Sequence, residues 1–165
     1  MVHRLNISRD ALSRTLTASI GLGYVEKNPG YGHPLRPEYL LTIGGESIAP
    51  AATHLLQHLR EGQLESIALN KWSLPALWVV GQNPSRYSEI QKALKGISPR
   101  ALALCLDDLE QAGLLTRDQQ IRPSYALSES GQRVRALLKA LNDGLQQTAE
   151  TTLSTAAHPP NQQRG

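Results

Sequence analysis

Apolar residues recur at helical spacing in several stretches of the chain, and the clearest of these begins just after residue 97. Ser98 and Pro99 are typical of a helix start, with serine as the N-cap and proline at the first helical position. Gly113 is typical of the left-handed residue that follows a helix. We therefore predict a helix between Ser98 and Gly113. Its inward face carries Leu102, Cys105, Leu106 and Leu109.

Two short strands and a final helix are expected after this helix. Residues 114–117 and 121–127 are predicted to be strands around a tight connection that contains Asp118. Ser128 is expected to cap the final helix. The inward positions of that helix are Val134, Leu137, Leu138 and Leu141.

Two further helices are expected upstream, within residues 64–96. Ser73 is expected to cap the first, which is apolar almost all round and should be deeply buried. Pro84 ends it, and a second helix runs from about Arg86 to Leu94. The predicted elements therefore come in the order of three helices, two strands and a final helix, which is the order of a winged helix-turn-helix. Its third helix is the candidate recognition helix, and its strand connection is the wing.

An earlier stretch of the chain repeats this pattern. Residues 7–45 match residues 97–131 in order, across helix, turn, strand and helix start. The matched pairs are Ile7-Ser8 with Ile97-Ser98, Ala11-Leu12 with Ala101-Leu102, Leu16 with Leu106, Gly23 with Gly113, Arg36-Pro37-x-Tyr39 with Arg122-Pro123-x-Tyr125, and Leu41-Thr42 with Leu127-Ser128. The offset is 90 residues before the Arg-Pro-x-Tyr element and 86 after it, so the first copy has extra residues between its strands.

The repeat predicts a tandem architecture. We expect a mainly α-helical fold with small β-wings, built from two winged helix-turn-helix units. Residues 1–62 would form a partial unit that lacks its opening helices, and residues 63–143 a complete one. Residues 144–165 are rich in Gln, Thr and Ala and are expected to be a disordered tail.

The partial unit has a predicted recognition helix over residues 8–20, a wing over 27–36 and a final helix over about 46–60. Without opening helices, the inner faces of its two helices would meet water. Burying one such side chain is worth roughly 1.5–3 kcal/mol, so these faces need a cover. The second unit, a second chain or further upstream residues are all open as covers. We expect one of the last two, so the chain should form a homodimer or soluble aggregates. The faces comprise Leu12, Leu16, Ile20, Leu55, Leu56 and Leu59.

Composition narrows the class of protein further. The net charge is +3 and the pI about 9.2, which suits a nucleic-acid partner without requiring one. The single cysteine excludes an intramolecular disulfide and a multi-thiolate metal site. No signal peptide and no apolar run long enough for a membrane span is found, so a cytoplasmic location is expected.

The complete unit resembles the HxlR group of winged-helix regulators, which are similar in architecture to the MarR group. The resemblance covers about residues 68–140, and the first copy shares its later half over residues 7–48. It implies a DNA-binding transcriptional regulator with one unit per chain that dimerises. The residues that carry it are Lys71-Trp72-Ser73, Arg86-Tyr87-Ser88-Glu89-Ile90, Gly96-Ile97-Ser98, Leu106-x-x-Leu109-Glu110-x-x-Gly113-Leu114 and Pro123-x-Tyr125-x-Leu127-Ser128-x-x-Gly131.

Polar and basic residues favour the first copy as the one that meets double-stranded DNA. Its predicted recognition helix offers two arginines and several hydroxyls for base edges and phosphates, and its glycine-rich wing offers phosphate partners and an aromatic tip. The helix candidates are Ser8, Arg9, Ser13, Arg14 and Thr17. The wing candidates are Lys27, Asn28, Tyr31, His33 and Arg36.

The second copy has fewer such groups. Its recognition helix presents Ala103, Leu104 and Asp107 where the first copy presents polar or basic residues. Its remaining DNA-contact candidates are Arg86, Ser98, Arg100 and Arg122. A second DNA reader and a unit used only for packing both remain open.

The sequence gives little support for a reactive thiol, a metal site or an enzyme active site. Cys105 lies among leucines and beside two aspartates, so a buried, unreactive thiol is expected. His54 and His58 share a helix face but lack a third metal ligand. No nucleophile elbow, phosphate loop or paired-carboxylate motif is present, so we expect neither an enzyme nor a cofactor. A small-molecule effector pocket beside Trp72 and Trp78 stays open as an alternative, although nothing in the sequence supports it.

We therefore expect a sequence-specific DNA-binding regulator, with helix 8–20 in the major groove and wing 27–36 on the DNA backbone. The alternative is a winged-helix interaction or dimerisation module that has lost DNA binding. The polar face of helix 8–20 favours the regulator, and the missing helices favour the module.

Overall fold

The computed structural model describes residues 8–28, 38–118 and 123–157. It forms two compact units, one made of Met1–Pro50 with Gly144–Gly165 (unit 1) and one made of Ala51–Asp143 (unit 2). These boundaries differ from the expected 1–62, 63–143 and 144–165, because two long helices contribute residues to both units. None of the helices in the described part of the chain is long and apolar enough to cross a membrane.

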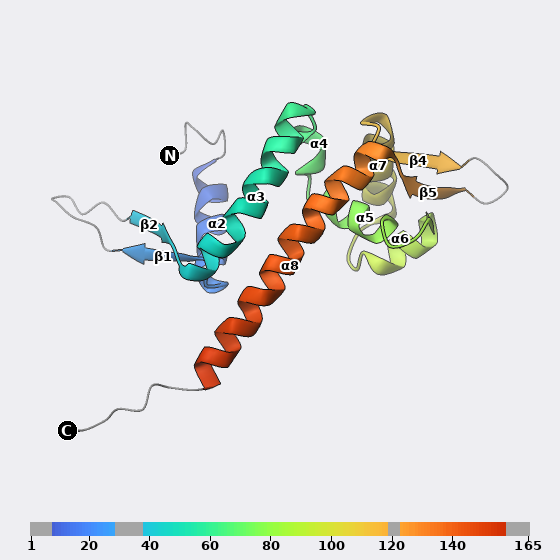
Figure 1. The fold of residues 1–165 in the computed structure, drawn as a ribbon. Helices are drawn as coiled ribbons and strands as arrows, with labels where there is room; N and C mark the ends of the chain where they lie inside the picture. Colours follow the sequence, from blue (N-terminus) through green and yellow to red (C-terminus); the bar gives the residue numbers. More distant parts are fainter. Residues whose placement is uncertain (1–7, 29–37, 119–122, 158–165) are drawn as a thin grey trace, which may run out of the picture. The chain divides into compact units, whose positions relative to one another are not determined.

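Unit 1 contains one complete helix, a β-hairpin and parts of two further helices (Figure 1). Helix α2 spans Arg9–Gly21, and strands β1 and β2 span Val25–Asn28 and Glu38–Leu41. The strands pair antiparallel, with Val25 opposite Leu41 and Asn28 opposite Glu38. Helix α3 spans Ile43–Glu61, so it begins before the expected residue 46.

Helix α8 spans Glu129–Ala157 and corrects the expectation of a disordered tail. Residues 144–157 are helical, whereas 158–165 lie outside the described residues. A tertiary contact supports this extension, because the hydroxyls of Ser47 on α3 and Thr148 on α8 lie 2.9 Å apart within unit 1. The sequence of the tail carried no sign of this contact.

Unit 2 holds the predicted order of helices and strands with two additions. Helices α5 (Ser73–Val80), α6 (Tyr87–Ala93) and α7 (Pro99–Gln111) and strands β4 (Leu115–Asp118) and β5 (Ser124–Leu127) were all expected. The short helix α4 (Glu65–Ala68) and strand β3 (Ser85–Arg86) were not. Strand β3 pairs with β5 to give a three-stranded sheet of order β3-β5-β4.

The hydrophobic core lies in unit 2 and is aliphatic, as expected. The side chains predicted on the inward face of α7, from Leu102 to Leu109, are buried as a group. Leu55 and Leu59 of α3 are 4% and 0% exposed in this same core. The prediction that unit 2 would not cover them was wrong, because the second half of α3 packs within unit 2. The fully buried leucines and isoleucine are Leu59, Leu77, Ile90, Leu102, Leu106, Leu109 and Leu114.

Unit 1 has a much weaker core. Helix α2 has no buried residue, and Leu12 and Leu16 on its inward face are half-buried. Several large apolar side chains of this unit are exposed, among them Leu22 at 68% and Ile43 at 88%. The sequence expectation of an incompletely covered apolar face therefore holds for α2 but not for the second half of α3.

One helix–strand–helix junction is built twice with the same hydrogen bonds. The Thr42 hydroxyl donates to the Gly23 carbonyl at 2.6 Å, and the Ser128 hydroxyl donates to the Gly113 carbonyl at 2.5 Å. Both glycines have left-handed backbones, with φ of 75° and 69°. Thr42 and Ser128 also cap the helices that follow them. The predicted cap at Ser128 is thus confirmed.

Candidate nucleic-acid interface

Helix α2 begins as the sequence predicted. The Ser8 side chain accepts a hydrogen bond from the Ala11 N–H at 3.1 Å and so caps the first turn. Because Leu12 and Leu16 turn inward, the opposite side of the helix faces solvent. This leaves one face of α2 accessible along its whole length.

That accessible face carries the predicted DNA-contact residues. Arg9, Ser13, Arg14 and Thr17 are all exposed, and so is the capping Ser8. The charged residues of α2 are these two arginines and a single aspartate, Asp10. Guanidinium groups and hydroxyls are the side chains that most often reach phosphates and base edges in the major groove. The helix can therefore supply both kinds of contact from one side.

The wing of unit 1 is described only at its base. Lys27 is exposed on β1, opposite Tyr39 in the strand register, and Asn28 next to it is half-buried. The other predicted wing contacts, Tyr31, His33 and Arg36, lie outside the described residues.

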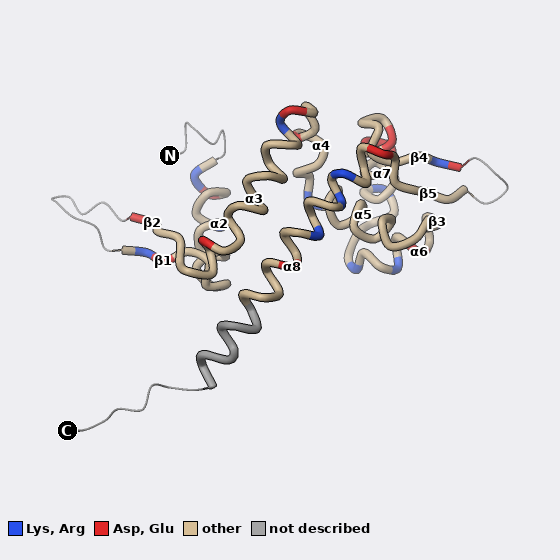
Figure 2. The backbone as a smooth tube through the Cα atoms, viewed as in Figure 1, with Lys and Arg blue, Asp and Glu red and all other residues tan. Residues whose placement is uncertain are grey.

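Helix α7 has the same start but a different surface. The Ser98 side chain accepts from the Ala101 N–H at 3.2 Å, which matches the cap of α2. Arg100 is exposed, yet it is the only basic residue of this helix against three acidic ones (Figure 2). Leu104, 55% exposed, occupies the middle of the outward face. A helix with this surface is poorly matched to the field between phosphates.

The remaining predicted contacts of unit 2 are Arg86 and Arg122. Arg86 is exposed, and its backbone N–H donates to the Glu89 carboxylate at 2.7 Å at the start of α6. The Tyr87 hydroxyl donates to the Pro99 carbonyl at 2.7 Å and so joins the start of α6 to the start of α7. Arg122 lies outside the described residues.

Sequence reasoning missed two basic residues near the start of α7: Lys92 in the last turn of α6, and Lys95 in the connection between α6 and α7. Lys92 and Lys95 are exposed just before the cap of α7. Gly96 takes a left-handed backbone with φ of 87°, which allows the turn to be tight. Helix starts with nearby cations attract phosphates. The signal was available in the sequence, as two lysines close to the predicted cap at Ser98.

Cys105 is buried, as expected. Burial raises the pKa of its thiol; a hydrogen bond from Ser73, with the two side-chain atoms 4.0 Å apart, lowers it, and the Asp108 charge raises it again. The Ser73 side chain is itself buried and forms no helix cap, so the prediction that Ser73 caps α5 was wrong. Within the described part of the chain, no group of His, Cys, Asp and Glu side chains could hold a metal ion.

The fold of unit 2 defines the class of protein. Three helices followed by a two-stranded wing and a closing helix form a winged helix-turn-helix, a DNA-binding architecture. Residues 67–152, more than half of the chain, match the HxlR-like helix-turn-helix family, and the chain belongs to that family. It is therefore a DNA-binding transcriptional regulator rather than an enzyme.

Several solved structures are similar to this chain. The chain is similar to a protein described as a transcriptional regulator of the MarR family from Enterococcus faecalis V583, at 25% identity and a TM-score of 0.50, over 62% of this chain and 92% of that one. It is also similar to the reduced transcriptional regulator YodB from B. subtilis, at 25% identity and a TM-score of 0.46, over 52% and 90%. A third similar protein, described as a possible HxlR family transcriptional factor from Thermoplasma volcanium GSS1, has 23% identity and a TM-score of 0.46, over 76% and 98%. No curated protein matched the chain.

Proposed function

We propose that helix α2 is the helix of this regulator that enters the major groove, with residues 27–36 as the wing on the DNA backbone. The observation that carries the proposal is the contrast between two equivalent helices. The outward face of α2 holds Arg9, Ser13, Arg14 and Thr17, whereas that of α7 holds an exposed leucine and acidic side chains. Base reading needs hydrogen-bonding groups on this face, and α2 is the better supplied helix.

The proposal includes a tandem arrangement in which unit 1 is a second, incomplete winged-helix unit. The repeated junction supports it, because the Thr42–Gly23 and Ser128–Gly113 hydrogen bonds occupy matched positions of the repeat. The matched caps at Ser8 and Ser98 support it further. Chance similarity between two amphipathic helices would not reproduce hydrogen bonds across a helix, a strand and the next helix start.

We also propose that the protein is a homodimer held together through unit 1. Unit 1 exposes apolar residues at positions where unit 2 has mostly small or acidic residues. The helix–strand–helix junction forms in unit 2 without these apolar side chains, so the fold of the junction does not require them in unit 1. Exposed apolar patches mark interaction surfaces, and the resemblance to HxlR regulators implies a second copy as the partner. The exposed residues are Ile20, Leu22, Leu40, Leu41 and Ile43, and their counterparts are Glu110, Ala112, Ala126, Leu127 and Glu129.

A second role is favoured for α7 by one observation. Leu104 is exposed on a helix whose polar groups are mainly acidic. Such a surface fits a protein partner better than it fits DNA. Unit 2 would then be the interaction module, while unit 1 reads the operator.

Fluorescence anisotropy with labelled duplexes from the region upstream of the protein's own coding sequence tests the DNA-reading helix. Arg14→Ala should weaken specific binding by roughly 1–3 kcal/mol, whereas Lys27→Ala should weaken all duplexes alike and lower the salt slope by about 1. Arg100→Ala, on the equivalent helix of unit 2, is the matched control and should change little. A larger effect of Arg100→Ala than of Arg14→Ala would assign DNA reading to α7. Salt-independent or undetectable binding would instead favour a pure interaction module.

A further inference from the structure

Strand β2 has an open edge where the matching strand of unit 2 is covered. In the described part of unit 1 the sheet has the order β1-β2, so β2 has a neighbour on one side only. In unit 2 the matching strand β5 lies between β4 and β3, and β3 places Ser85 opposite Tyr125. The repeat puts Tyr39 at the position of Tyr125. The open edge of β2 thus lies where unit 2 adds a third strand.

One hydrogen bond of unit 1 identifies which backbone groups of β2 point to this open edge. The Thr42 N–H donates to the carbonyl of Tyr24, just before β1, at 3.2 Å. Successive residues of an antiparallel strand direct their backbone groups to opposite edges, so those of Leu40 point toward β1 as well. The N–H and C=O groups of Tyr39 and Leu41 point to the open edge. Such an edge is a template for pairing with another chain.

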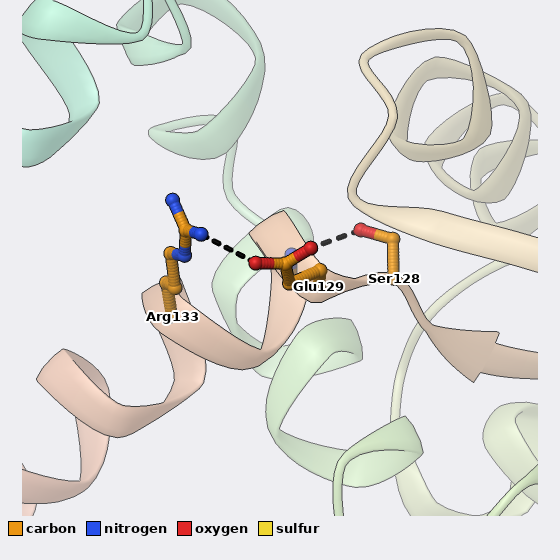
Figure 3. A network of polar contacts seen from close by, with 4 residues as sticks. Ser128, Glu129 and Arg133 are labelled. Carbon is orange, nitrogen blue, oxygen red and sulfur yellow. Dashed lines mark hydrogen bonds and ion pairs between the residues drawn. The ribbon is translucent and has the colours of Figure 1, made fainter.

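The side chains next to the open edge are apolar in unit 1 but not at the matched positions of unit 2. Leu40 is 45% exposed, and its counterpart on β5 is Ala126. Ile43, at the start of α3, is exposed, and its counterpart is Glu129. Glu129 forms an exposed ion pair with Arg133 (Figure 3). Unit 2 therefore keeps this surface charged, whereas unit 1 combines an open strand edge with exposed apolar side chains.

A second copy of β2 fits the open edge when it runs antiparallel with Leu40 opposite the partner's Leu40. Tyr39 then lies opposite the partner's Leu41, so the outward backbone groups of both residues are paired in both chains. Glu38 lies opposite the partner's Thr42, and no like charges meet. A two-fold axis at Tyr39 instead would place Leu40 opposite a glutamate and leave the outward groups of Leu41 without a strand partner.

We propose that two copies of the chain join their β2 edges into one continuous antiparallel sheet of order β1-β2-β2-β1, with Leu40 at the two-fold axis. This inference rests on the proposed homodimer and deepens it, because it names the strand and the register through which the chains meet. The same edge serves both chains, so the contact is self-complementary and association stops at two copies.

Disulfide formation in the full-length chain tests this register. Cys105 is first replaced by alanine, so that each protein carries a single thiol. Leu40→Cys places two thiols in a pair whose Cα atoms lie about 4.5 Å apart, within the range of a disulfide. Glu38→Cys is the matched control, because Glu38 is exposed on the same face of β2, yet its two copies would lie at least about 13 Å apart. Under mild oxidation we expect covalent dimers to form at least about tenfold faster from Leu40→Cys.

Hydrogen exchange of the wild type covers the case in which a cysteine variant fails to fold. At concentrations where light scattering finds a dimer, the amides of Tyr39 and Leu41 should exchange at least about tenfold more slowly than in the diluted monomer. The Leu40 amide, which points toward β1, is the internal control and should change little on dilution.

The outcomes separate this inference from the homodimer itself. A dimer without faster cross-linking at position 40, or with unprotected Tyr39 and Leu41 amides, overturns the shared sheet while the homodimer stands. Disulfides that form faster between Leu40→Cys and Glu38→Cys chains than between two Leu40→Cys chains overturn the register. A wild type that stays monomeric at every concentration overturns both the homodimer and the shared sheet.

Discussion

Gly45 packs its Cα against the backbone carbonyl of Tyr24, so closely that an added Cβ would lie 2.1 Å from the carbonyl oxygen. Gly131 and Leu114 repeat this relationship in unit 2, with a corresponding distance of 2.0 Å. In unit 1 this contact places the first turn of α3 against Tyr24, the residue after Gly23 at the end of α2. In unit 2 it places the first turn of α8 against Leu114, the residue after Gly113 at the end of α7. The two glycines thus allow the start of each helix to pack directly against a backbone carbonyl.

Alanine at either glycine should be strongly destabilising. The added methyl group would overlap a backbone oxygen that cannot move aside, so Gly45→Ala and Gly131→Ala should each lower the free energy of unfolding by roughly 1–3 kcal/mol or more. Urea denaturation separates the two units, because both tryptophans, Trp72 and Trp78, lie in unit 2. Gly131→Ala should shift the tryptophan transition, and Gly45→Ala should shift mainly the loss of far-UV circular dichroism.

Gly21→Ala is the matched control for these two variants. Gly21 ends α2, and an added Cβ there would have no atom within 4 Å. Alanine restricts the unfolded chain more than glycine does, so this variant should be unchanged or more stable by about 0.4–1 kcal/mol. Equal stability of all three variants would contradict the packing described here.

The sequence predicted the elements whose signals are local. Ser8 and Ser98 each precede a helix with apolar residues at helical spacing, and both caps are present in the structure. The hairpins follow from short apolar runs next to Gly23 and Gly113, whose left-handed backbones end the helices. The repeat itself was visible because it preserves these same capping and turn residues.

The missed features depend on contacts between distant residues. Strand β3 has only two residues, too few for an alternating pattern, and it forms because Ser85 lies opposite Tyr125. Ser73 resembles a helix cap in sequence, but its hydroxyl turns toward Cys105 in the core. The extension of α8 is accompanied by the contact between Ser47 and Thr148. The two partners lie 32 residues apart for Ser73 and Cys105, 40 apart for Ser85 and Tyr125, and 101 apart for Ser47 and Thr148.

Cys105 should react slowly with thiol reagents in the native protein. Burial raises the pKa of its thiol above the ordinary value of 9.0 and keeps reagents away from the sulfur. A raised pKa means that the unfolded state loses this proton first as the pH rises. The stabilising contribution of the protonated thiol is therefore complete below about pH 9 and is lost as the pH rises through the folded-state pKa.

Two measurements check this account of Cys105. Labelling by a coloured disulfide reagent should be much faster in urea than in buffer. Unfolding experiments across the alkaline range should show a steeper fall in stability for the wild type than for Cys105→Ala, which lacks the titrating group. Rapid labelling of the native protein, or identical alkaline profiles for the two proteins, would show that the thiol is accessible.

The proposed dimer should depend on apolar residues that unit 2 does not share. Ile43→Glu and Leu22→Ala place in unit 1 the residues found at the matched positions of unit 2, Glu129 and Ala112. Because both side chains are exposed, the changes should cost the fold little and should remove contact area between chains. Light scattering should find a dimer for the wild type and a monomer for the double variant. A monomeric wild type with a single sharp unfolding transition would rule out the dimer.

The most direct test of DNA reading by α2 is site-specific photo-crosslinking at two matched positions. A photoreactive amino acid is placed at Ser13 in one protein and at Ala103, 90 residues later, in another; both positions are exposed on the outward face of their helix. Each protein is bound to the same operator duplex and irradiated, and the DNA adducts are counted. We predict efficient crosslinks from position 13 and few from position 103. Crosslinks that form mainly from position 103 would contradict the assignment and make α7 the recognition helix of this protein.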